Sequence, residues 1–172
     1  VHGSAYYCRK MLDVYKEEKA ERLVLLGDLL YHGPRNDLPR EYAPKQVISM
    51  LNDMKKEIYA VRGNCEAEVD QMVLQFPVMA DYCILNLDGR TFYATHGHIY
   101  NENNLPPIQE GDILIHGHTH VLKAEQKEGY VLLNPGSVSI PKEGNPPTYA
   151  TFEDGVFTIK DFEGNIVKSI EL

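Results

Sequence analysis

Hydrophobic positions in the first half of the chain recur alternately at helical spacing and in short continuous runs. Helical spacing predicts amphipathic helices, and a short apolar run that ends in glycine is typical of a strand buried on both faces. Ser4 and Pro44 are residue types that begin helices. The predicted helices cover residues 5–19, the stretch from 44 and residues 66–75, and the predicted strands cover 23–26 and 58–61.

The second half consists mostly of strands. Asp88-Gly89 lies between two alternating segments and predicts a tight hairpin. The tail alternates around further Asp-Gly and Gly-Asn pairs, which indicates a meander of antiparallel strands. The predicted strands are 82–87, 91–95, the start of the tract 112–120, 130–133 and the tail from 149. Together the two halves predict an α/β domain with helices outside a sheet or paired sheets.

At 172 residues, the chain is expected to form a single domain over 1–172 with a full hydrophobic core. No apolar run approaches the roughly 18 residues that a membrane-spanning helix needs, so no membrane partner is expected. Cys8, Cys65 and Cys83 are odd in number and widely spaced. This pattern favours a reducing cytoplasm over a disulfide framework and argues against a thiolate zinc site.

The net charge of −8 limits the range of partners. A protein that holds nucleic acid tightly needs several basic side chains along one face, and no such run is present. A small anionic substrate remains compatible with the acidic balance, because a bound metal ion outweighs distant carboxylates locally.

Histidines supply the strongest chemical signal. Five of the seven lie within 25 residues, at positions 96, 98, 116, 118 and 120. Because side chains alternate along a strand, His118 and His120 are expected to project to the same side. Two imidazoles at the end of a strand can each bind a metal ion or share one. The alternative is a set of histidines that are solvated or hydrogen-bonded within the core.

Polar residues of metal-binding types follow four separate apolar strands, each beside a glycine. In open α/β sheets, ligands bind beyond the carboxyl ends of the strands, so these side chains are expected to converge. Each has a structural alternative: Asn64 can cap the next helix, Asp28 can begin a turn, and His96 can be a core residue. The set comprises Asp28, Asn64, His96 and the pair His118 and His120.

The order of these motifs resembles the calcineurin-like metallophosphoesterase superfamily. Over essentially the whole chain, the motifs are similar to those of the bacterial YfcE-type phosphodiesterases. They are His2-Gly3, the stretch from Gly27-Asp28 to Asn36, Gly63-Asn64-Cys65-Glu66, His96-Gly97-His98, Gly117-His118-Thr119-His120 and residues 134–141. The resemblance implies a two-sheet αββα sandwich. It places a first central strand, and the Asp of an Asp-x-His motif, immediately before Val1.

The resemblance also implies a site for two divalent metal ions. Asp28 would bridge them, Asn64, His96 and His118 would complete one side, and His2 and His120 would serve the other. Imidazole, carboxylate and amide ligands without thiolate favour Mn²⁺, with Fe²⁺ and Zn²⁺ also compatible. His98 is expected to support the ligands and His116 to be packed in the core.

The implied activity is hydrolysis of a small phosphodiester by a hydroxide activated between the two metals. Many family members carry His after the metal-binding Asn to protonate the leaving group, whereas this chain has Cys65. A thiol is a weak proton donor at neutral pH, so good leaving groups or a donor elsewhere are expected. His32 is the candidate donor, and Arg35 or Arg62 the candidate contact for a phosphate oxygen. For both, a solvated surface role is the alternative.

The main competing hypothesis is a non-catalytic binding or scaffold protein on the same fold with a degraded metal site. Cys65 and the missing Asp favour it, whereas the retained ligand types argue against it. A metallo-β-lactamase-type site is disfavoured because Val121-Leu122 interrupt its motif. A barrel amidohydrolase needs about 250 residues. The apolar tail strands are expected to be able to pair between subunits, as in a homo-oligomer.

Overall fold

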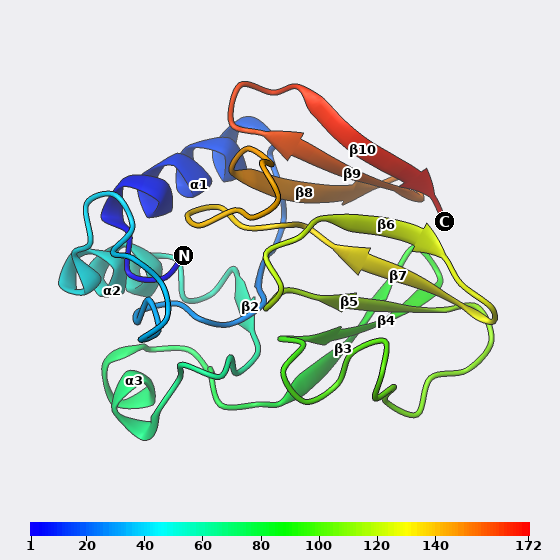
Figure 1. Cartoon of the computed structure of the whole chain (residues 1–172), viewed down its shortest axis with the longest axis horizontal. Coiled ribbons are helices and arrows are strands. Elements are labelled where there is room, and N and C mark those ends of the chain that lie inside the picture. Colours follow the sequence, from blue (N-terminus) through cyan, green and yellow to red (C-terminus); the bar gives the residue numbers. More distant parts are fainter.

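The computed structural model describes residues 1–172 as three helices and ten strands. The helices gather on one side of the molecule and most of the strands on the other (Figure 1). The helices are α1 (Ala5–Glu17), α2 (Pro44–Asp53) and α3 (Glu68–Val73). The strands are β1 (Leu23–Leu25), β2 (Ile58–Ala60), β3 (Tyr82–Leu87), β4 (Arg90–Thr95), β5 (Asp112–His116), β6 (Lys123–Gln126), β7 (Tyr130–Asn134), β8 (Thr148–Glu153), β9 (Val156–Asp161) and β10 (Ile166–Glu171).

The helices begin where their capping residues predict. The Ser4 hydroxyl accepts a hydrogen bond from the Tyr7 N–H at 3.2 Å and caps α1, and Pro44 opens α2. Helix α1 ends at Glu17 and α3 covers only Glu68–Val73, so both are shorter than their predicted ranges. The short α3 buries none of its side chains.

The largest sheet has five strands in the order β3-β4-β5-β7-β6. Its three central strands are parallel, whereas β3 and β6 pair antiparallel at the edges. Parallel pairing brings the carboxyl ends of β4, β5 and β7 to the same edge of the sheet. The sequence Lys-Ala-Glu-Gln of β6 is polar, and the hydrophobic pattern did not predict this edge strand.

A second, antiparallel sheet has the order β10-β9-β8 and packs on the first. The contact is a core of buried side chains, among them Phe92 and Ile113 from the large sheet and Phe157 and Ile159 from β9. This combination of packed sheets and helices confirms the predicted mixed α/β fold class. β10 is an outer strand and leaves Ile166 65% exposed; pairing between subunits along it stays a prediction.

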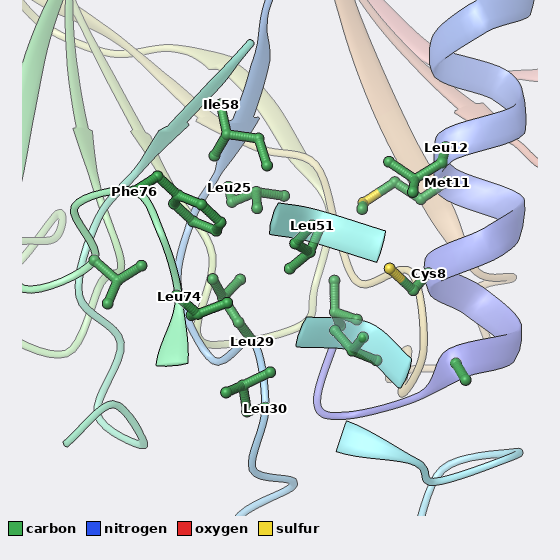
Figure 2. Close-up of a cluster of buried hydrophobic side chains, with 14 residues drawn as sticks. Cys8, Met11, Leu12, Leu25, Leu29, Leu30, Leu51, Ile58, Leu74 and Phe76 are labelled. Atoms are coloured by element: carbon green, nitrogen blue, oxygen red, sulfur yellow. The ribbon is translucent and has the colours of Figure 1, made fainter. Parts of the chain in front are cut away.

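The helices have their own core, which they share with the short parallel pair β1-β2. Figure 2 shows Cys8, Met11 and Leu12 projecting from α1 toward side chains from β1 and α2. Val47 and Leu51 of α2 are fully buried in this cluster. The core therefore fixes α1 and α2 against the strand that leads into Asp28.

β1 and β8 are both edge strands. A largely apolar cavity of about 650 Å³ is lined by residues of both, including Leu25 and Phe152. His2, His96, His118 and His120 also line it, so one end of the cavity adjoins the candidate site. The central strand that the resemblance places before Val1 lies outside the chain described and stays a prediction.

Candidate functional site

The structure brings together the six side chains that the sequence analysis selects as metal ligands. They come from five segments that are distant in sequence: His2 before α1, Asp28 after β1, Asn64 after β2, His96 after β4, and His118 and His120 after β5. The expectation that strand ends converge therefore holds for their placement. Whether these residues bind metal stays a prediction.

Asp28 lies at the centre of the cluster. One group of potential ligand atoms comes from His2, Asp28 and His120, and a second from Asp28, His96 and His118, with the atoms of each group within 4.8 Å of one another. The Oδ2 atom of Asp28 lies 3.5 Å from Nε2 of His2 and 3.4 Å from Nε2 of His96. Only Asp28 belongs to both groups, as expected of a bridging carboxylate.

His96 is held with one ring nitrogen facing the cluster. Its Nδ1 lies 2.6 Å from the carbonyl oxygen of Leu26, and because a carbonyl only accepts, Nδ1 must carry the proton. Nε2 then faces Asn64 Oδ1 at 3.0 Å and His118 Nδ1 at 3.1 Å. A backbone contact that fixes the tautomer and frees the other nitrogen is the usual arrangement of a metal-ligating histidine.

Asn64 does not cap the following helix. The N-cap position of α3 is Ala67, three residues later, and the Asn64 carbonyl oxygen instead contacts His96. The structure therefore rules out the capping role that the sequence left open for Asn64. Asp28 likewise faces the cluster with its carboxylate, and its backbone adopts a left-handed conformation.

Four of the six candidate ligands adopt left-handed backbone conformations. The φ angles are 55° at His2, 54° at Asp28, 61° at His118 and 60° at His120. Such angles cost free energy for residues with a β-carbon, and residues held in them cluster at functional sites. The backbone just after β1 and β5 therefore adopts a conformation that costs free energy locally. This conformation directs the side chains of the candidate ligands toward one another.

The cluster favours neutral imidazoles and an ionised carboxylate. Burial lowers the pKa of His2 to about 4 and that of His120 to about 3, and the charges of neighbouring groups contribute. Burial alone would raise the pKa of Asp28, but the close imidazoles of His2 and His96, together with the hydrogen bond from the Cys65 N–H, outweigh it and hold the pKa well below its usual range. These are the protonation states that bind metal ions.

Two buried ring nitrogens in the cluster have no hydrogen-bond partner, Nε2 of His2 and Nδ1 of His120. Buried polar atoms are normally paired, so unpaired ones need an explanation. A divalent cation between these rings and the Asp28 carboxylate would supply it. The donor set of imidazole, carboxylate and amide fits Mn²⁺, Fe²⁺ or Zn²⁺.

Glu66 organises the site, although the sequence analysis assigned it no role. It is 4% exposed, and its carboxylate accepts hydrogen bonds from the backbone N–H groups of Asp28 at 2.8 Å, Leu29 at 2.7 Å and Gly63 at 2.6 Å. These contacts join the turn after β1 to the turn after β2. An acidic residue at the start of a predicted helix is typical of an exposed first-turn residue, so its burial could not be predicted from its position in the sequence.

The segment after β7 supports the other side of the cluster. Ser139 places its hydroxyl 3.3 Å from Nδ1 of His2. The fully buried Asn134 donates to the carbonyl oxygen of Gly117 at 2.9 Å and to the Thr119 hydroxyl at 3.1 Å. The motif at 134–141 therefore holds the loop that carries His118 and His120.

Cys65 lies beside the cluster, but its thiol is poorly suited to acid catalysis. Burial raises the pKa of Cys65 to about 12, and the nearby Asp28 carboxylate contributes to this shift. The backbone N–H of Cys65 donates to Asp28 Oδ1 at 3.0 Å. The thiol therefore stays protonated.

His32 and Arg35 occupy the loop that follows Asp28. The His32 ring packs edge-on against Tyr31 and Tyr42, with centroids 4.8 and 5.2 Å away, and its Nδ1 is buried without a partner. Arg35 is exposed and near enough to influence the pKa of Cys65 and of His118. Their predicted roles, proton donor and phosphate contact, stay predictions.

His116 is fully buried, with Nε2 3.0 Å from a carboxylate oxygen of Glu102, as expected of a packed residue. His98 lies close to the candidate ligands, with its ring centroid 5.3 Å from that of His96.

None of the three helices combines the length and the apolar character that a membrane-spanning helix needs.

Comparisons with known proteins agree with this geometry. The calcineurin-like phosphoesterase superfamily domain matches residues 1–154. The chain is 44% identical to phosphodiesterase YfcE of Escherichia coli strain K12 over 159 residues, which cover 92% of this chain and 86% of that protein. It is 28% identical to the probable metallophosphoesterase YsnB of Bacillus subtilis over 127 residues, 67% of this chain and 70% of that protein.

Solved structures show the same relationship. The structure of YfcE, a phosphoesterase from E. coli, superposes with a TM-score of 0.97 at 41% identity, covering 99% of this chain and 94% of the other. Vacuolar Protein Sorting 29 from Cryptosporidium parvum matches with a TM-score of 0.59 at 17% identity over 95% and 89% of the two chains, which shows a shared fold alone. The chain therefore belongs to the calcineurin-like phosphoesterase superfamily, as the order of its motifs predicts.

Proposed function

We propose that this protein is a metal-dependent phosphodiesterase that hydrolyses small phosphodiesters at a centre of two divalent ions. Its assignment as a hydrolase of phosphodiester bonds rests on membership of the superfamily and on the 44% identity to a protein named as a phosphodiesterase. The number of ions, their identity as Mn²⁺, the bridging role of Asp28 and the substrate go beyond those findings.

One observation carries the proposal. Because Nδ1 of His96 donates to a backbone carbonyl, its Nε2 presents a lone pair toward the carbonyl oxygen of Asn64 at 3.0 Å and the carboxylate of Asp28 at 3.4 Å. Acceptor atoms facing one another repel unless a proton or a cation lies between them. A divalent cation satisfies all of them at once, and the same argument applies to the unpaired nitrogens of His2 and His120.

In this proposal Asp28 bridges the two ions, Asn64, His96 and His118 hold one, and His2 and His120 hold the other. The ions, when bound, supply Lewis-acid activation of a water molecule and neutralise charge on the phosphate. Glu66 fixes the direction of the Asp28 carboxylate through the backbone, and Ser139 orients the ring of His2. No protein nucleophile is required.

Cys65 gives the leaving group little help, because its raised pKa makes the thiol a poor proton donor. His32 is the proposed donor because its loop continues directly from Asp28 and its Nδ1 has no partner. Arg35, exposed in the same loop, is the proposed contact for a phosphate oxygen. Esters of acidic alcohols or phenols are accordingly the preferred substrates.

The proposed setting is the reducing cytoplasm, with residues 1–172 acting as one domain. Cys8, Cys65 and Cys83 are all free thiols, which fits that environment. The acidic net charge argues against a tightly held nucleic acid.

The test is hydrolysis of bis(p-nitrophenyl) phosphate by metal-stripped protein after addition of Mn²⁺. Asn64→Ala should lower turnover by roughly a hundredfold or more, because loss of a residue that only hydrogen-bonds to a metal ligand often costs 10- to 100-fold. Asn103→Ala is the matched control, since Asn103 is exposed and its side chain makes no hydrogen bond. A folded protein that shows no turnover with any divalent metal would make the scaffold hypothesis the leading account.

A further inference from the structure

Three aromatic rings pack against one another in the segment between β1 and α2. They form an aromatic cluster of Tyr31, His32 and Tyr42. His32 lies between the two tyrosines, with ring centroids 4.8 and 5.2 Å away and interplanar angles of 73° and 78°. Edge-to-face contacts of this kind are a favoured geometry for aromatic pairs. The proposed chemistry uses His32 alone and gives the two tyrosines no role.

One end of the aromatic cluster packs against the segment that carries His2. Tyr42 pairs with Ser4 in an isolated β-bridge, and a β-carbon at Gly3 would lie 2.9 Å from Cδ2 of Tyr42. Glycine therefore allows the ring to approach the backbone directly after His2. These contacts fix the aromatic cluster to the His2 side of the candidate metal site.

The loop at His32 also lies against Cys65. A β-carbon at Gly33, directly after His32, would meet Sγ of Cys65 at 3.5 Å, which is ordinary van der Waals contact. The N–H of Cys65 in turn donates to Oδ1 of Asp28 at 3.0 Å. The aromatic cluster is therefore next to a residue that hydrogen-bonds to the central carboxylate of the candidate site.

Tyr31 is the member of the aromatic cluster that is most open to solvent. It is 42% exposed, whereas His32 and Tyr42 are half-buried. The side-chain amide of Asn36 donates to the carbonyl oxygen of His32 at 2.7 Å and holds the loop that carries the ring. A ring that is fixed before binding loses little conformational entropy when another ring packs on it.

We propose that Tyr31, supported by His32, forms a subsite for an aromatic ring of the substrate, and that the substrates are phosphodiesters carrying an aryl group or a nucleobase. The inference rests on the proposed function and names its substrate class. A substrate ring on the open side of Tyr31 extends the existing series of ring contacts by one member. Such contacts favour a planar aromatic ring over a saturated ring of similar size, because part of the attraction comes from the π-system and not from buried area.

The test compares two ligands of equal charge and similar size, methyl benzylphosphonate and methyl cyclohexylmethylphosphonate. Each is a monoanion like a phosphodiester, and a stable P–C bond holds its ring, so binding is measured without turnover. Calorimetric titration of the Mn²⁺-loaded protein should give a Kd about threefold to tenfold lower for the benzyl compound. Tyr31→Leu should bring the ratio of the two Kd values close to one. Tyr31→Phe should preserve the ratio, because the ring and not the hydroxyl makes the contact.

Tyr59→Leu is the matched control. Tyr59 is 45% exposed on β2, and its ring contacts Arg22, with 5.6 Å between the guanidinium carbon and the ring centroid. This variant should keep the full preference for the benzyl compound. Equal Kd values in the parent protein overturn the proposal. A preference that survives in Tyr31→Leu, or that disappears in Tyr31→Phe, overturns it as well.

Turnover of bis(p-nitrophenyl) phosphate separates failure of this inference from failure of the proposed function. Metal-dependent turnover together with equal Kd values eliminates the subsite and leaves the phosphodiesterase activity in place. A preference for the benzyl compound that depends on Tyr31, in a protein without turnover, supports the subsite and removes the proposed activity. If neither phosphonate binds the metal-loaded protein, the subsite is eliminated whatever the catalytic result.

Discussion

The carboxylate of Glu66 accepts a hydrogen bond from the backbone N–H of Asp28 at 2.8 Å, across 38 positions of sequence. The same carboxylate binds the N–H of Gly63, directly before Asn64, at 2.6 Å. One buried side chain therefore sets the separation of the segments that carry Asp28 and Asn64. Burial raises the pKa of Glu66, and the backbone donors oppose that rise.

Glu66→Gln should lower both stability and metal retention. The amide NH₂ of glutamine would face backbone donors in place of an acceptor, leaving buried N–H groups unpaired. We expect a loss of about 2–4 kcal/mol in the free energy of unfolding. Urea denaturation measures the stability, and metal analysis after gel filtration measures retention. Glu68→Gln, exposed in α3, is the control; an equal effect there would remove the special role of Glu66.

Asp28→Ala and His120→Ala should differ in how many ions the protein loses. Asp28 belongs to both ligand groups and His120 to one only. We expect Asp28→Ala to weaken binding of both ions and His120→Ala to leave one ion bound at close to its original affinity. Titration of the metal-free proteins with Mn²⁺, followed by calorimetry, gives the stoichiometry. Identical stoichiometry in the two variants would contradict the bridging role.

Gly27→Ala should be far more damaging than Gly129→Ala, although both glycines have similar positive φ angles of 87° and 81°. A β-carbon at Gly27 would lie 2.5 Å from the backbone nitrogen of Gly63 and 2.9 Å from Nδ1 of His96, whereas one at Gly129 would meet nothing within 4 Å. Gly129→Ala therefore costs only the left-handed conformation, about 1–2 kcal/mol. Thermal unfolding of both variants measures the difference, and equal losses would show that contact with the site is unimportant.

Glu102 should contribute stability that disappears in acid. Burial would raise its pKa, but hydrogen bonds with Lys123 and the backbone and the charge of His116 lower it to about 2. Because the folded pKa lies below the unfolded value of about 4.3, the contribution is complete above that pH and is lost as pH falls toward 2. The stability difference between the parent and Glu102→Gln should be constant near neutral pH and shrink between about pH 4 and pH 2. Denaturant unfolding at several pH values tests this, and a difference that grows in acid would contradict it.

The alternation of helical and strand spacing predicted nearly all of the elements, because burial of apolar side chains has a different period in each. Two features escaped it. Strand β6 is polar because it lies at a sheet edge where one side faces water. Its strand conformation comes from pairing with β7, which the hydrophobic pattern of β6 alone does not predict. The length of α3 was overestimated. Its apolar residues Val69 and Met72 are exposed and do not pack against a core, so their spacing was no guide to where the helix ends.

For the candidate site, the residue types alone indicated metal-binding chemistry. A polar residue beside glycine at the end of each strand was sufficient to select the candidate ligands. The strand alternation predicted for His118 and His120 was wrong, because β5 ends at His116 and both residues lie beyond it in left-handed conformations. Only the tertiary structure decided which nitrogen of His96 is free, that Asn64 faces the cluster in place of capping a helix, and that Glu66 is buried. These properties depend on contacts between segments tens of residues apart, and local spacing carries no information about such contacts.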